Sequence, residues 1–182
     1  RDCLLSRGLG DVYKRQVLTS LMVVKAGKAK DIREARILLE ETLDSGKALQ
    51  VMKEWIVAQG GTAEEVEHPD LLPQALCQEA VCAEKSGFVT KIHTEEIGRI
   101  CMLLGGGRAK KGDPIDLSVG LVLRKKVGDP VHSGESLAIL HANDREKLAE
   151  AKERLLKAYE IKKEPVAVRP LIWEILDGTE AE

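Results

Sequence analysis

The sequence predicts an α+β protein, with helices in its first third and a compact block of strands and helices in its second half. Three observations lead to this fold class. The 182 residues are 43% hydrophobic but only 3% aromatic, apolar side chains recur at helical spacing up to residue 61, and apolar residues alternate between glycine turns after residue 79. A chain of this length can hold one substantial core or two small ones.

Charge and hydropathy exclude several kinds of partner. The chain carries 28 Lys and Arg against 30 Asp and Glu, a net charge of −2, so electrostatics give no case for nucleic acid or an anionic membrane. The longest apolar stretch, residues 17–24, is interrupted by Thr19 and Ser20 and is far shorter than the roughly 20 residues that a membrane-spanning helix needs. We therefore expect a soluble protein that binds neither nucleic acid nor membrane.

The cysteines and histidines match no metal pattern. Cys3, Cys77, Cys82 and Cys101 have neither zinc nor haem spacing, and Cys77 and Cys82 are too far apart for a two-residue redox loop. The four histidines occur singly along the chain. We predict no metal site, and we expect reduced thiols in a cytoplasm.

Residues 1–16 do not read as the start of a protein. They begin without Met and show neither a secretory pattern nor a helical or strand period. The stretch from Gly10 to Gln16 resembles translated sequencing-adapter sequence at the broken end of an assembled gene. We therefore set residues 1–16 aside as non-native, and we expect the protein to continue upstream of Val17, which makes this chain a C-terminal piece.

Residues 17–61 predict helices. The first covers residues 17–26 and ends at Gly27, the second begins at Asp31 as N-cap, and the third begins near Lys47. The second and third helices carry apolar faces of the kind that is buried in an intact protein, formed by Ile32, Ala35, Leu38, Leu39, Thr42, Leu43, Ala48, Leu49, Met52, Trp55 and Ile56. Because the elements that would cover them are missing here, we expect these faces to form an exposed apolar patch. These helices would be the last ones of a truncated central domain.

Residues 62–79 predict a linker, because polar residues and prolines replace the helical period there. Beyond the linker we expect short strands over residues 80–83 and 88–92. Thr94, followed by two glutamates, opens a helix, and the glycines from Gly105 onward end it abruptly.

The loop after this helix holds the candidate functional residues. They are Gly105, Gly106, Gly107 and Arg108. Three glycines followed by cations could present N–H groups to an anion, but a phosphate loop precedes a helix, whereas this one follows a helix. Helix termination and a domain-contact role are the two other interpretations. Asp113 and Asp116 bracket Pro114, which favours turn formation, with a catalytic carboxylate pair as the alternative.

Residues 80–178 are expected to form a separate C-terminal domain of β-hairpins, barrel-sandwich-like and packed with two helices. Strands are predicted over 119–123, 127–131, 136–141 and 169–176, and an amphipathic helix over 145–161 with Leu148, Ala151, Leu155 and Tyr159 inward. Biotinyl and lipoyl carrier domains share such hairpins. A carrier needs a modified lysine at an exposed hairpin tip, however, and the next lysine after the hairpins is Lys147, inside the predicted helix.

Two long motifs carry a family resemblance. Residues 105–120, GGGRAKKGDPIDLSVG, and 125–143, KKVGDPVHSGESLAILHAN, closely resemble the C-terminal domain of pyrimidine-nucleoside and thymidine phosphorylases. Shorter collinear motifs upstream resemble the same proteins, at residues 35–41, 45–49, 58–61 and 70–75. The resemblance covers about residues 17–176.

The resemblance implies a homodimeric enzyme with a helical domain and a large α/β domain that close over the substrates. Its reaction is the reversible phosphorolysis of uridine, deoxyuridine or thymidine to a free pyrimidine and an α-pentose 1-phosphate, with phosphate as co-substrate. The family's catalytic, phosphate-binding, pyrimidine-binding and potassium-binding residues all precede Val17. The resemblance therefore assigns no catalytic, substrate-binding or metal residue here, and it leaves Gly105, Gly106, Gly107 and Arg108 as candidates for domain closure.

Two other functions compete with a phosphorylase piece. One is a carrier-type module, which a mass shift on a modified lysine would reveal. The other is an independent binding or scaffolding domain, which a genuine start codon upstream of Val17 in the intact gene would support.

Overall fold

The computed structural model divides the chain into two compact units, a helical unit that extends to His68 and a mixed unit that begins at Pro69. The structure describes residues 9–167, 170 and 172–176, with side chains from residue 14 onward. The fold class is α+β, as the sequence predicts: among the described residues the helical unit has helices and no strand, and the mixed unit combines helices with antiparallel sheets.

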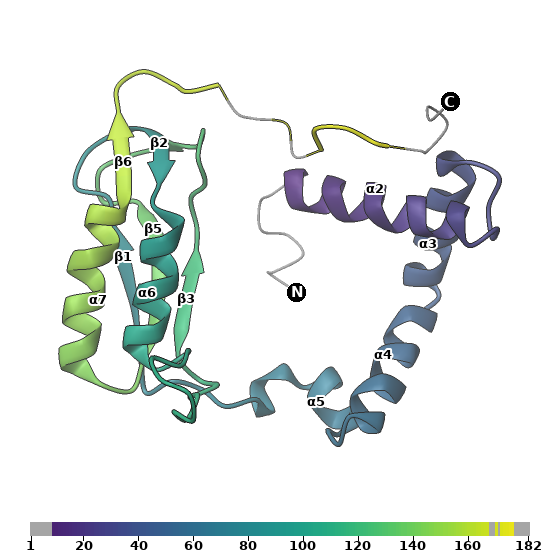
Figure 1. Cartoon of the computed structure of the whole chain (residues 1–182), viewed down its shortest axis with the longest axis horizontal. Helices are drawn as coiled ribbons and strands as arrows, with labels where there is room; N and C mark the ends of the chain where they lie inside the picture. Colours follow the sequence, from purple (N-terminus) through teal and green to yellow (C-terminus); the bar gives the residue numbers. More distant parts are fainter. Residues whose placement is uncertain (1–8, 168–169, 171, 177–182) are drawn as a thin grey trace. The chain divides into compact units, whose positions relative to one another are not determined.

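In its described residues the helical unit contains four helices in chain order (Figure 1). They are α2 (Leu9–Lys25), α3 (Ile32–Asp44), α4 (Lys47–Ala58) and α5 (Ala63–Glu67). The cap predicted at Asp31 is confirmed, since its carboxylate accepts the Glu34 N–H at 2.9 Å. No helix in the described part of the chain is long and apolar enough to cross a bilayer.

Two expected segments look different in the structure. Helix α2 begins at Leu9, inside the segment set aside as adapter-like, whose origin stays a prediction. Helix α5 lies inside the predicted linker, where Thr62 and Glu65 form a reciprocal capping box. The capping signal Thr-x-x-Glu is readable in the sequence, but the helix that it opens has only five residues, Ala63–Glu67.

The apolar faces of α3 and α4 are largely exposed, as expected for helices whose packing partners lie outside this chain. Ala35 is buried, but α4 has no buried residue, and Leu49, Met52 and Trp55 are 48%, 46% and 62% exposed. Helical spacing identifies which face is apolar, but burial also needs a second surface to pack against. The faces are present as predicted, and the contacts of α3 and α5 with α4 leave Ala48 and Ile56 half-buried and most of its apolar face exposed.

The mixed unit arranges its strands in two three-stranded antiparallel sheets. The first has the order β1-β5-β3 and the second the order β4-β2-β6. The elements are η1 (Pro69–Leu71), β1 (Cys77–Cys82), β2 (Gly87–Ile92), α6 (Thr94–Leu104), β3 (Gly120–Leu123), β4 (Pro130–Val131), β5 (Ser136–Ala142), α7 (Arg145–Ala158) and β6 (Tyr159–Lys162).

This pairing corrects the predicted hairpins. β1 and β2, which are consecutive, belong to different sheets, and so do β4 and β5. β5 instead pairs with β1, where Ala80 lies opposite Ile139, and with β3, where Val122 lies opposite Ile139. The described strands form two open sheets rather than a barrel. Local glycine turns indicate where a strand ends, but they do not fix its partner when the pairing is long-range.

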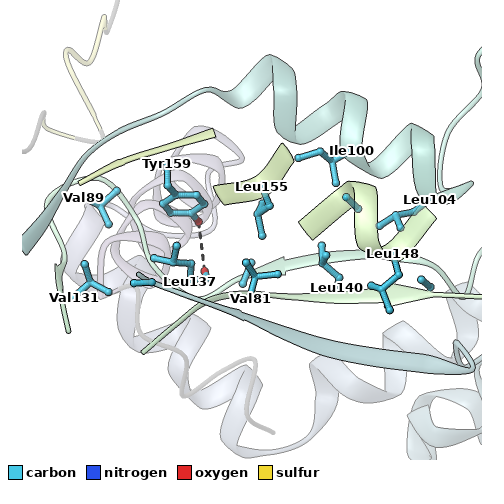
Figure 2. Packing of buried hydrophobic residues seen from close by; sticks show 14 residues of the cluster. Val81, Val89, Ile100, Leu104, Val131, Leu137, Leu140, Leu148, Leu155 and Tyr159 are labelled. Carbon is cyan, nitrogen blue, oxygen red and sulfur yellow. Dashed lines mark hydrogen bonds between the residues drawn. The ribbon is translucent and has the colours of Figure 1, made fainter. Parts of the chain in front are cut away.

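The core of the mixed unit lies between its strands and the helices α6 and α7, which pack against each other (Figure 2). α7 also contacts β1, β5 and β6, and α6 contacts β3. The buried cluster is formed by Val81, Ala83, Val89, Ile100, Leu104, Val131, Leu137, Ala138, Leu140, Ala142, Leu148, Ala151, Leu155 and Tyr159. All four residues predicted to face inward from the helix at 145–161 are in this cluster.

The last predicted helix and strand need correction. α7 ends at Ala158 rather than at residue 161, because Tyr159 is extended and begins β6, which pairs with β2. Residues 170 and 172–176 have no regular secondary structure, so the strand predicted over 169–176 is wrong for them. Residues 168, 169 and 171 lie outside the described part of the chain.

Candidate functional site

The glycine loop begins as a tightly bonded helix end. Gly105 takes a left-handed conformation with φ of 108°, and its N–H donates to the Met102 carbonyl at 3.1 Å. The Gly106 N–H donates to the Cys101 carbonyl at 2.9 Å. The predicted helix-ending role of Gly105 is confirmed. Two of the three glycine N–H groups are therefore already bonded to the helix and cannot also bind an anion, which counts against the interpretation of this loop as an anion site.

Gly106 lies where a side chain would force its neighbours to move. A Cβ there would stand 2.9 Å from the Cys101 Sγ and 3.3 Å from the carbonyl oxygens of Cys101 and Val119. Gly107 is less confined, because a Cβ would meet only Met102 atoms at 3.5 Å or more. The loop is therefore fixed at Gly106 by close backbone packing between the end of α6 and the start of β3.

Arg108 closes the tip of its own loop. Its Nε donates to the Asp113 carbonyl at 3.1 Å, and the Asp113 carboxylate accepts the Lys110 N–H at 2.8 Å. The Arg108 side chain is exposed, so the guanidinium nitrogens beyond Nε remain available to solvent or to a partner. The loop tip thus presents a cation on a preorganised turn.

Asp116 anchors the other end of the loop. Its Oδ1 accepts the Ser118 N–H at 2.9 Å and the Ser118 hydroxyl at 2.6 Å, and its Oδ2 accepts the Asn143 Nδ2 at 2.7 Å. These hydrogen bonds, those from Ser118 first, hold the pKa of the Asp116 carboxyl below its usual range. Asp113 and Asp116 each serve a separate turn, which confirms the turn interpretation over a carboxylate pair.

An open pocket of about 490 Å³ lies beside the root of this loop. Leu104 and Gly105 contribute the end of α6, Pro114, Ile115 and Asp116 the returning loop, and Asn143, Asp144 and Lys147 the start of α7. Among the described side chains no group of three His, Cys, Asp or Glu residues gathers to hold a metal ion. Among the residues that line this pocket, no nucleophile is paired with a base.

Asn143 is the polar residue of this region that the sequence interpretation missed. It lies between β5 and α7, and its side chain bonds to the loop from 27 positions away in the sequence. The one available signal was its place at the end of the long motif ending HAN, immediately before Asp144, the N-cap of α7. Sequence spacing alone could not show the long-range bond.

The carrier alternative finds no support in this region. β5 passes into α7 through Asn143 and Asp144 instead of turning into a hairpin partner. Lys147 lies in the first turn of α7, and its backbone N–H donates to the Asp144 carboxylate at 3.1 Å. A lysine at that position is part of a helix, not of an exposed hairpin tip.

The segment from β2 to β6, residues 88–162, matches the pyrimidine nucleoside phosphorylase C-terminal domain. Over 143 residues, 78% of its length, the chain is 50% identical to the pyrimidine-nucleoside phosphorylase of Staphylococcus aureus strain bovine RF122 / ET3-1, and 49% identical to that of strain USA300. The chain spans about a third of the length of these relatives, 33% of each.

The matched segment holds both halves of the loop described above, from Gly105 to Ser118, and Asn143 as well. The similarity also extends beyond the domain. The aligned 143 residues exceed the matched segment, and only 20 residues follow it, so most of the remaining aligned residues precede Phe88. The helical unit therefore shares in the resemblance to phosphorylases.

Proposed function

We propose that this chain is the C-terminal part of a pyrimidine-nucleoside phosphorylase, which transfers a pentose from a pyrimidine nucleoside to phosphate. The observation that carries the proposal is the 50% identity over 78% of the chain, reaching beyond the matched domain. In this reaction a phosphate oxygen bonds to the anomeric carbon while the bond from that carbon to the base nitrogen breaks. The base leaves with the bonding electrons and takes up a proton, and α-pentose 1-phosphate is the other product.

The mixed unit's part in this reaction would be domain closure rather than chemistry. Arg108 at the tip of a hydrogen-bonded turn, and Gly106 packed against α6, give a fixed loop with an exposed cation. Such a loop can contact a carboxylate or carbonyl across a cleft and favour the closed state, in which water is excluded and reactants are aligned. Gly105 and Gly107 would shape the same loop.

A chimera tests the proposal. Residues 17–176 would replace the matching C-terminal third of the S. aureus enzyme, and phosphate-dependent release of uracil from uridine would be measured. We expect the chimera to be active and the 182-residue chain alone to be inactive, because the groups that position phosphate and stabilise the leaving base are held by the other two thirds. A folded chimera without phosphorolysis would contradict the proposal.

The closure role is tested in the same chimera with Arg108→Ala. Loss of a charged hydrogen bond formed in the closed state should lower kcat/KM by about tenfold or more. Lys111→Ala, which removes an exposed cation from the same loop, is the matched control and should leave kcat/KM within about twofold. Equal effects of the two substitutions would show that the loop acts only through its net charge.

The same proposal includes a cytoplasmic homodimer acting on uridine, deoxyuridine or thymidine. The exposed apolar faces of the helical unit support the packing of a further protein surface against them. The described cysteines Cys77, Cys82 and Cys101 form no disulfide in the structure, which suits a reducing compartment. Light scattering of the intact protein measures the oligomeric state.

A further inference from the structure

The side chain of Asn143 joins two segments that are distant in the sequence. Its Oδ1 accepts the backbone N–H of Leu76 at 2.7 Å. Its Nδ2 donates to the Asp116 Oδ2 at 2.7 Å and to the Ser118 hydroxyl oxygen at 2.9 Å. One amide group therefore bonds to the chain just before β1 and to the returning half of the glycine loop.

The two sets of bonds depend on each other. A carboxamide has its acceptor and its donors on opposite sides, so only one orientation directs the oxygen at an N–H and the nitrogen at a carboxylate. Asp116 holds Nδ2 on the loop side, and Asp116 is itself held by the two bonds from Ser118. If the loop side is lost, the Asn143 amide can rotate away from Leu76.

Each partner is tied to a larger segment. Leu76 ends the stretch that runs from η1 to β1, close to where the mixed unit begins at Pro69. The Asp116 N–H donates to the Gly105 carbonyl at 3.0 Å, which connects it to the end of α6. The Asn143 amide thus stands between the entry of the chain into the mixed unit and the root of the glycine loop.

We propose that Asn143 is a positioning residue that couples the entry segment at Leu76 to the glycine loop, so that the two are held or released together. The coupling goes beyond the proposed phosphorylase function and needs no enzymatic activity. The coupling is a property of the mixed unit alone. Its test can therefore fail while the proposed phosphorylase function holds, and the proposed function can fail while the coupling holds.

The test uses residue-resolved amide hydrogen exchange of the full 182-residue chain. Asp116→Ala removes the acceptor of Asn143 Nδ2 and leaves the acceptor of the Leu76 N–H in place, and it should nevertheless raise the exchange rate of the Leu76 amide about tenfold, the equivalent of one net hydrogen bond. Asn143→Ala should raise it by a similar factor. The matched control is Asp113→Ala, which removes a carboxylate cap from the same loop without touching Asn143 and should leave the Leu76 amide unchanged.

The amide of Leu140 in the centre of β5 separates local from global effects. Coupling predicts that Leu76 exchange rises while Leu140 exchange changes less. If Asp116→Ala leaves Leu76 protected, or if the Leu76 and Leu140 amides accelerate by the same factor, the proposal is overturned. Should Asp116→Ala fail to fold, Ser118→Ala removes only the hydroxyl bonds and should raise Leu76 exchange severalfold, with an unchanged rate again contrary to the proposal.

Discussion

At the scale of single residues, Gly106 makes the most stringent demand on the sequence. Because Gly106 has no side chain, the end of α6 can pack closely against the start of β3. A Cβ at Gly106 would lie 3.3 Å from the Val119 carbonyl oxygen. The Cys101 Sγ, which would be 2.9 Å from that Cβ, sits in the same partly buried spot. A substitution at Gly106 therefore changes packing first, whatever the loop does in a longer protein.

We predict that Gly106→Ala lowers the free energy of unfolding of the mixed unit by about 1–3 kcal/mol, because neighbouring atoms must move to accept a methyl group. Urea unfolding followed by circular dichroism measures this. Gly107→Ala is the matched control, since its Cβ would make only ordinary contacts, and should change stability by less than about 0.5 kcal/mol. Equal losses for both variants would show that the confinement at Gly106 is not the cause.

At the scale of elements, the passage from α7 to β6 shows what local pattern leaves out. Tyr159 continues the apolar face of the helix, so the spacing alone extends α7 past it. The structure instead places Tyr159 in an extended conformation, with its hydroxyl donating to the carbonyl oxygens of Lys125 at 3.0 Å and Leu137 at 3.4 Å (Figure 2 draws the bond to Leu137). Burial of the ring is readable from the sequence, but its distant hydrogen-bond partners are not.

Other elements also show that local signals can be read from the sequence and long-range pairing cannot. Both ends of helix α6 were predictable, because Thr94 with two glutamates and the glycines after Leu104 are local signals. The partners of β1 and β5 were not, since Ala80 and Ile139 meet across 59 positions and nothing near either residue specifies the other. In the candidate site, Gly105 could be predicted from its turn, whereas Asn143 could not, for the same reason.

Tyr159 also makes a pH dependence predictable. Burial first, and then the Asp129 carboxylate, raise the pKa of Tyr159 from 10.0 to about 12. Between about pH 10 and 12 the Tyr159 hydroxyl therefore keeps its proton in the folded state and loses it in the unfolded state. The contribution of Tyr159 to the free energy of unfolding is complete below about pH 10 and is lost as the pH rises toward about 12.

We predict that Tyr159→Phe costs about 1 kcal/mol at pH 8, from the lost hydrogen bonds, and that the difference from the unsubstituted chain shrinks between about pH 10 and 12. Urea unfolding of both chains at pH 8, 10 and 11 measures it, and taking the difference cancels the titration of lysines common to both. A constant difference across this range would contradict the pKa shift.

At the scale of the whole molecule, the two units differ in how they hide apolar surface. The mixed unit buries fourteen residues in one cluster. In the helical unit Ala35 is buried, while Met22, Leu43 and Trp55 are 69%, 68% and 62% exposed. Because stability follows the apolar area removed from water, the two units should differ widely in their opening free energies.

We predict that amide hydrogen exchange of the 182-residue chain will show slow exchange in α6, α7 and β5, and faster exchange, by about a hundredfold or more, in α3 and α4. Few buried contacts oppose local opening of these two helices, whereas opening of β5 exposes residues from both of its neighbours in the sheet. Mass spectrometry of peptic fragments over a dilution series measures the difference and separates it from self-association, which would protect the apolar faces only at high concentration.

Equal protection of α4 and β5 at the lowest concentration would mean that the helical unit is stable by itself. The exposed faces would then be compatible with a folded, independent unit, and their need for the rest of a phosphorylase would lose its physical support.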